Sequence, residues 1–178
     1  MDGPLVQFLK DNFSTIFPFF TFSVGWFGSR WTMTKKERKD VEQKQFENGK
    51  ELMLAQRDTF NEFASALKRY ADKRQDGTVS LDDFYNISTI GEKYFYQQRI
   101  TSDAILLDRV DTQSRDNTLV PSITDAVQRT LPSYYKTLSG IAKKAGFEYS
   151  GILRRENYES MYSVVEKYGK LAASDRPH

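Results

Sequence analysis

The sequence predicts an all-α protein, with an N-terminal single transmembrane helix followed by a small bundle of four to five amphipathic helices. The first observation is an uncharged apolar block near the N-terminus, where seven of the thirteen Phe lie within the first 27 residues. The second is the polar remainder, in which apolar residues recur every three or four positions. That period is typical of amphipathic helices, whereas alternation typical of strands is scarce.

The apolar block runs from Asn12 to Ser29 and carries no charge. Its 18 residues would span roughly 27 Å as a helix, close to the ~30 Å thickness of the hydrocarbon core of a bilayer. We therefore expect residues 1–31 to form a membrane anchor. A cleaved signal peptide, a buried core helix and a hairpin on the membrane surface are the alternatives. The apolar anchor residues are Phe13, Ile16, Phe17, Phe19, Phe20, Phe22, Val24, Trp26 and Phe27.

Basic residues flank this block unequally. Only Lys10 precedes it, whereas the residues that follow it include Arg30, Lys35, Lys36, Arg38 and Lys39. By the positive-inside rule, this bias predicts a single-pass membrane protein whose C-terminal domain is cytoplasmic. We interpret residues 32–45 as a charged juxtamembrane segment, residues 46–173 as the helical cytoplasmic domain and residues 174–178 as a disordered tail.

The first helix of the polar part is expected at residues 34–73, either continuous or broken at Asn48–Gly49. Its apolar stripe would consist of Phe46, Met53, Phe60, Phe63, Leu67 and Tyr70. Further helices are expected at residues 81–110, 121–145 and 154–172. Pro132 would either kink the helix at 121–145 or open a new helix. Between them we expect a turn at Asp76–Gly77, a polar loop at residues 111–122 and a break at residues 146–151.

Composition disfavours an enzyme. The chain has no cysteine, its one histidine is the terminal His178, and no Walker, GxGxxG, HExxH or GxSxG motif occurs. We expect no catalytic residue and no cofactor. A net charge of +2, with basic and acidic residues mixed along the helices, also makes nucleic acid an improbable partner. Most of the ten tyrosines are expected at the rim of the core, and a few at a binding surface.

Residues 72–84, DKRQDGTVSLDDF, resemble the calcium-binding loop of the EF-hand family. Asp72, Asp76 and Asp83 match ligand positions one, five and twelve of that loop, and Gly77 matches its turn glycine. The resemblance implies a calcium site at the three carboxylates.

Two departures from the EF-hand pattern imply a degenerate site. Arg74 stands where a ligand oxygen belongs, and Asp83 is shorter than the usual bidentate glutamate. A plain helix–turn–helix produces the same pattern, if Asp76–Gly77 forms the turn and Ser80 with Asp83 forms a capping box at the next helix.

Three functional hypotheses follow from these features. The first is a non-enzymatic, membrane-anchored interaction or scaffold protein, an accessory subunit of a larger complex, whose partners are the lipid bilayer and either another protein or further copies of itself. The second is a membrane-tethered sensor with the degenerate calcium loop. The third is an effector whose Phe-rich segment perturbs the bilayer.

Overall fold

The computed structural model describes residues 35–174, in which every regular element is helical. The α-helices are α3 (Lys35–Gln75), α4 (Leu81–Leu106), α5 (Thr112–Ser114), α6 (Val120–Asp125), α7 (Leu131–Ala145) and α8 (Glu159–Ser174). Two π-helical turns, Arg115–Leu119 and Ala126–Thr130, and a 3₁₀ turn, Arg155–Tyr158, complete the set. The prediction of an all-α bundle is confirmed for this part of the chain.

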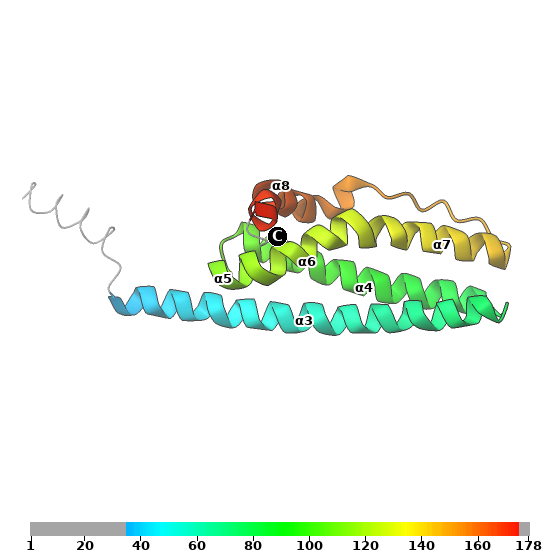
Figure 1. Ribbon diagram of the computed structural model, residues 1–178, viewed down its shortest axis with the longest axis horizontal. Helices are drawn as coiled ribbons and strands as arrows, with labels where there is room; N and C mark the ends of the chain where they lie inside the picture. Colours follow the sequence, from blue (N-terminus) through cyan, green and yellow to red (C-terminus); the bar gives the residue numbers. More distant parts are fainter. Residues whose placement is uncertain (1–34, 175–178) are drawn as a thin grey trace, which may run out of the picture. The chain divides into compact units, whose positions relative to one another are not determined.

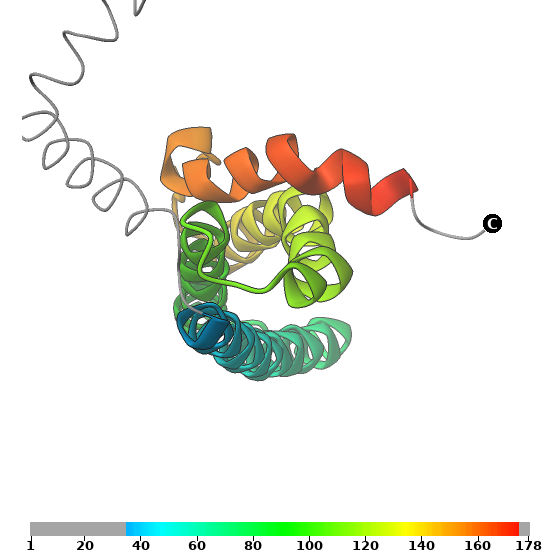
Figure 2. The ribbon, with the colours of Figure 1, turned by 90° about the vertical axis from the view of Figure 1, so that its left-hand side faces the viewer.

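Residues from Gln43 onward belong to one compact unit. In it the part of α3 from Gln43 onward, α4 and the continuous helix formed by α5, α6 and α7 run side by side (Figure 1). Seen from the end, α8 crosses these helices and covers α4 and α6 (Figure 2). Met161 and Val164 of α8 are fully buried in that contact. The bundle is therefore closed on one side by α8 and on the opposite side by α3.

The core contains an aromatic cluster that joins α3, α4 and α7. Phe63 stacks on Tyr94, with ring centroids 5.4 Å apart, and meets Phe95 and Tyr134 edge-on. All four side chains are buried. Aliphatic residues extend this core towards α8, among them Ile87, Ile105, Leu119, Ile123, Leu131, Leu138 and Ile141.

The inward face of α3 differs from the predicted stripe. Its buried residues are Gly49, Gln56, Thr59, Phe63 and Ala66, whereas Phe46 and Phe60 are 57% and 48% exposed. The predicted burial of these two phenylalanines is wrong, because small and polar side chains occupy the inward positions. Gln56, for example, donates a buried hydrogen bond of 2.8 Å to the side chain of Gln98 on α4.

No break occurs at Gly49, where α3 continues without interruption. This glycine allows a close approach instead of ending the helix. A Cβ at residue 49 would lie 2.7 Å from Asp111 Oδ2 and 2.9 Å from Ser114 Oγ. Since ordinary van der Waals contact needs more than 3 Å, a larger residue would push the start of α5 away from α3.

The polar loop predicted at residues 111–122 is wrong, because the chain is helical from Thr112. Asp111 caps this helix by accepting a 2.9 Å hydrogen bond from the backbone N–H of Ser114. The helix then runs to Ala145 through both prolines, so Pro132 does not open a separate helix.

A π-helical turn lies directly before each proline. The N–H of Val120 donates to Arg115 and that of Leu131 donates to Ala126, both five residues back instead of four. Proline has no N–H to donate and its ring crowds the preceding turn. The wider π turn lets the helix pass Pro121 and Pro132 without ending.

Most other predicted boundaries are confirmed. Gly77 and Gly146 adopt left-handed φ angles of 72° and 76°, at the turn after α3 and at the end of α7. Helix α4 ends at Leu106, four residues earlier than predicted, and the connection includes Asp108 with a φ of 54°. The last α-helix begins at Glu159, five residues later than predicted, and the 3₁₀ turn Arg155–Tyr158 precedes it.

The predicted localisation is contradicted. Among residues 35–174, none of the helices has both the length and the apolar character that crossing a membrane requires. The longest, α3, carries charged side chains along its whole length, and these could not be solvated in hydrocarbon. We therefore withdraw the interpretation of a single-pass membrane protein with a cytoplasmic C-terminal domain. The predicted anchor, residues 1–31, lies outside the described residues.

Candidate functional site

A surface pocket of about 740 Å³ opens between α4, α7 and the segment that leads into α8. We name it the tyrosine pocket, because five tyrosines and one phenylalanine line it: Phe95, Tyr96, Tyr134, Tyr135, Tyr149 and Tyr158. Its charged lining residues are Glu92, Lys93, Arg99 and Glu156. Its volume lies in the range typical of sites for small molecules or for single side chains of a partner.

The rings on the inner side of the pocket are fixed by packing and hydrogen bonds. The hydroxyls of Tyr135 and Tyr158 lie 3.1 Å apart and share a hydrogen bond. Tyr134 donates to the backbone carbonyl of Ser88 over 3.1 Å, and its ring lies directly over Gly91. Because three helical or turn segments supply these rings, the pocket exists only in the folded chain.

The hydroxyls of Tyr134, Tyr149 and Tyr158 stay protonated at neutral pH. Burial raises the pKa of Tyr158 and of Tyr134 well above the ordinary value of 10, and the nearby carboxylate of Glu92 raises both further. Burial and the same carboxylate also raise the pKa of Tyr149. These groups are therefore neutral hydrogen-bonding side chains, and none of them is activated as a base or nucleophile.

The cationic side chain of Lys93 is paired with an acid that does not line the pocket. Its Nζ lies 2.7 Å from Glu62 of α3, so its charge is paired outside the pocket. Glu92 makes only a long contact of 3.5 Å with the hydroxyl of Ser88. Once Lys93 is paired with Glu62, the charged lining residues that remain are Glu92, Glu156 and Arg99, so the lining keeps two negative charges and one positive charge.

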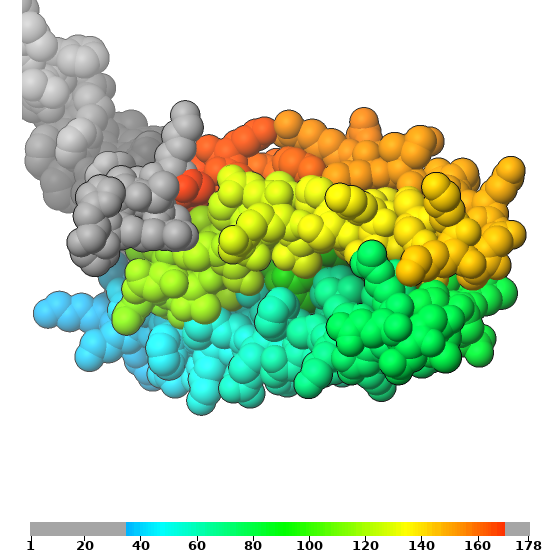
Figure 3. Space-filling model, turned by 45° about the vertical axis from the view of Figure 1, so that its right-hand side comes forward, coloured from blue at the N-terminus to red at the C-terminus, as the bar shows by residue number. Residues whose placement is uncertain are grey.

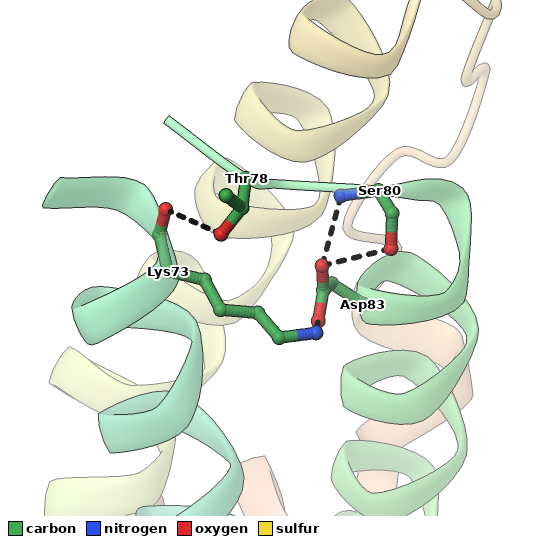
Figure 4. A network of polar contacts seen from close by, with 4 residues as sticks. All are labelled: Lys73, Thr78, Ser80 and Asp83. Carbon is green, nitrogen blue, oxygen red and sulfur yellow. Dashed lines mark hydrogen bonds and ion pairs between the residues drawn. The ribbon is translucent and has the colours of Figure 1, made fainter. Parts of the chain in front are cut away.

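The loop that resembles an EF-hand contains a different arrangement of its acids (Figure 4). Asp83 Oδ1 lies 2.6 Å from Lys73 Nζ, and Asp83 Oδ2 accepts hydrogen bonds from the backbone N–H and the hydroxyl of Ser80 at 2.8 and 3.0 Å. Thr78 donates to the carbonyl of Lys73. The predicted capping box at Ser80 and Asp83 is confirmed.

The three predicted calcium ligands are not brought together. Asp72 lies in the last turn of α3, Asp76 follows that helix, and both side chains are exposed, whereas Asp83 is buried. Across the described part of the chain, no three acidic or histidine side chains are placed to hold a metal ion. Asp83 instead joins the end of α3 to the start of α4.

The capping carboxylate predicts a pH dependence of stability. Burial alone would raise the pKa of Asp83, but the hydrogen bonds from Lys73 and Ser80 outweigh it and hold that pKa below its ordinary value of 3.8. A carboxyl whose pKa is lowered by folding stabilises the fold at pH values above its unfolded-state pKa of about 3.9. This stabilisation is lost as the pH falls through the folded-state pKa.

We therefore expect Asp83→Asn to lose less unfolding free energy than the wild type between pH 5 and pH 2, although it is less stable at pH 7. Urea denaturation at a series of pH values measures this, with Asp82→Asn as the control for replacing an exposed acid in the same helical turn. Parallel pH profiles for wild type and Asp83→Asn would contradict the prediction.

The remaining predicted site residues are only partly described. The nine apolar anchor residues and Arg30 lie outside the described residues. Lys35, Lys36, Arg38 and Lys39 occupy the exposed first turns of α3. Sequence reasoning missed the tyrosine pocket, for which the high tyrosine content was the one available signal.

Comparison with known proteins adds no family: no family model matches this sequence, and no characterised protein or solved structure is significantly similar to the chain.

Proposed function

We propose that the protein is a non-enzymatic interaction domain that uses α3 to bind an amphipathic helix of a partner protein. The observation that carries this proposal is a line of apolar residues at seven-residue spacing, Phe46, Met53, Phe60 and Leu67, which we name the α3 stripe. Seven residues are close to two helical turns, so the four side chains lie along one side of α3. Such a line is typical of helices that pair with another helix.

The α3 stripe is accessible at Phe46 and Phe60, whereas Met53 and Leu67 also pack against the core. Phe46 and Phe60 are about half exposed, and Met53 and Leu67 are partly exposed. The ring of Phe60 packs against the buried ring of Tyr94, with ring centroids 6.0 Å apart. A supported, accessible aromatic ring can anchor a partner with little loss of its own conformational freedom.

The stripe lies on the side of α3 that is next to α7. Arg74, one further seven-residue step beyond Leu67, lines a groove of about 260 Å³ together with Lys136 and Lys144 of α7. Figure 3 shows α3 and the helix formed by α5–α7 side by side on this face of the unit. A helix bound to the stripe would therefore contact α3 and also reach the edge of α7.

The charges around the stripe favour an acidic partner. Lys50 and Arg57 lie one helical turn from successive stripe residues, with Arg57 3.6 Å from the carboxylate of Asp58. The groove at the end of the stripe is lined by three cations and no acid. We expect a partner helix whose apolar seam is flanked by Asp or Glu, since opposite charges at the rim guide association and fix orientation.

The test uses the full chain as bait in extracts of its natural source. We expect the captured partner to be lost with the double variant Phe46→Glu and Phe60→Glu, because two carboxylates would face the partner's apolar seam. Ile152→Glu is the control, since it replaces an apolar residue elsewhere that is 70% exposed, more than Phe46 or Phe60. Capture should also weaken with rising salt.

Two results would overturn the proposal. One is capture that survives the Phe46→Glu and Phe60→Glu variant as well as it survives Ile152→Glu. The other is a stripe occupied by a second copy of the chain, which sedimentation velocity would reveal as a dimer that the double variant dissociates.

A further inference from the structure

The tyrosine pocket combines aromatic rings with an excess of one unpaired negative charge. Tyr135, Tyr149 and Tyr158 are half-buried, so parts of their rings remain open to a ligand, while Tyr96 is 61% exposed at the mouth. Aromatic rings carry negative charge on their faces and attract cations within about 6 Å. A group of four such rings around one pocket is suited to a cation with an apolar surface.

The acidic side chains support the same ligand class. Glu92 lies close enough to Tyr149 and Tyr158 to influence their hydroxyls, and Glu156 lines the pocket two residues before Tyr158. Of the two cations in the lining, Lys93 is paired with Glu62 outside the pocket. Arg99 is two helical turns from Glu92, roughly 10 Å along the axis of α4, and its one positive charge leaves an excess of one negative charge over Glu92 and Glu156.

We propose that the tyrosine pocket binds an organic cation, a quaternary ammonium or similarly large apolar cation, with Glu92 as its counter-charge. The volume of about 740 Å³ exceeds that of one cationic group, so the pocket also accommodates the molecule or peptide that carries it. This site is separate from the α3 stripe, and the proposal does not depend on the one made for that surface.

The probe is choline, titrated into the full chain by calorimetry and followed by tyrosine fluorescence. Its neutral analogue 3,3-dimethylbutan-1-ol has the same shape without the charge. A short peptide with one trimethyl-lysine, compared with the same peptide carrying leucine there, distinguishes a free organic cation from a side chain of a partner protein. We expect a charged probe to bind at least 10-fold more tightly than its neutral match.

Two exposed variants test the residues without disturbing the core. Glu92→Gln should weaken binding of the charged probe roughly 5-fold, with Glu51→Gln, an exposed glutamate on α3, as its control. Tyr96→Ala should weaken it roughly 3-fold, whereas Tyr85→Ala removes a ring that is 60% exposed on the same helix and outside the pocket.

Binding of choline, of the trimethyl-lysine peptide or of both, with the expected dependence on Glu92 and Tyr96, supports the proposal. Equal binding of charged and neutral probes would overturn it, because the pocket would then recognise shape alone. The absence of binding by both charged probes at millimolar concentration would overturn it too, as would losses of equal size in the control variants.

Discussion

Phe63→Ala is expected to lower the unfolding free energy by about 3–5 kcal/mol, the usual range for removing a fully buried ring. Phe63 is 1% exposed, and its ring contacts α4 through Tyr94 and Phe95 and α7 through Tyr134. These three neighbours are large and fixed, so the space left by the ring would not close. Because much of the inward face of α3 is small or polar, no neighbouring residue compensates.

Phe60→Ala is the matched control, since the same substitution is made on the same helix three residues earlier. Phe60 is 48% exposed and touches only the edge of the cluster through Tyr94. We expect it to cost no more than about 1 kcal/mol, in keeping with a half-exposed side chain. Urea denaturation followed by circular dichroism measures both, and similar losses for the two variants would mean that α3 is not held by Phe63.

Which face of α3 is buried could not be predicted from hydropathy. Buried residues are mostly apolar, but large apolar residues are often exposed, especially where a close helix contact needs small side chains. Gly49 lies directly against Ser114, and Gln56 is satisfied only by Gln98, a residue 42 positions away. Neither contact is visible along α3 itself. The existence and extent of the helix were predictable, whereas its orientation depends on these distant partners.

The helix across residues 111–145 shows the same limit. Its first turns read as a loop because they are polar and precede Pro121. Asp111 nevertheless caps them, and the π turns at Arg115–Leu119 and Ala126–Thr130 accommodate both prolines. The buried residues Leu119, Val120 and Ile123 then anchor this stretch in the core. Tertiary burial outweighed local preference here.

The two candidate sites differ in how far the sequence could predict them. The turn at Gly77 and the capping box of Ser80 and Asp83 depend on residues within four positions of each other, so both could be predicted from the sequence. The tyrosine pocket joins residues from Thr89 to Tyr158 that meet only after folding. The pairing of Lys73 with Asp83 was also missed, and it replaces the calcium geometry that the spacing of the acids implied.

Gly91→Ala should destabilise the protein by about 2 kcal/mol, although alanine is the better helix former. A Cβ at residue 91 would overlap the ring of Tyr134, which is 4% exposed and hydrogen-bonded to Ser88. The ring would have to leave both that hydrogen bond and its contact with Phe63. Overpacking of this kind costs about 1–3 kcal/mol and exceeds the helix-propensity gain of roughly 1 kcal/mol.

Gly140→Ala makes the same change on α7, where a Cβ would meet no atom within 4 Å. It should stabilise the protein by up to about 1 kcal/mol, because only the propensity gain remains. Thermal or urea denaturation of the two variants should therefore give shifts of opposite sign. In a Tyr134→Ala background the cost of Gly91→Ala should disappear, since the ring it collides with is gone. A cost that persists there would place the strain in the backbone of α4, not in its contact with α7.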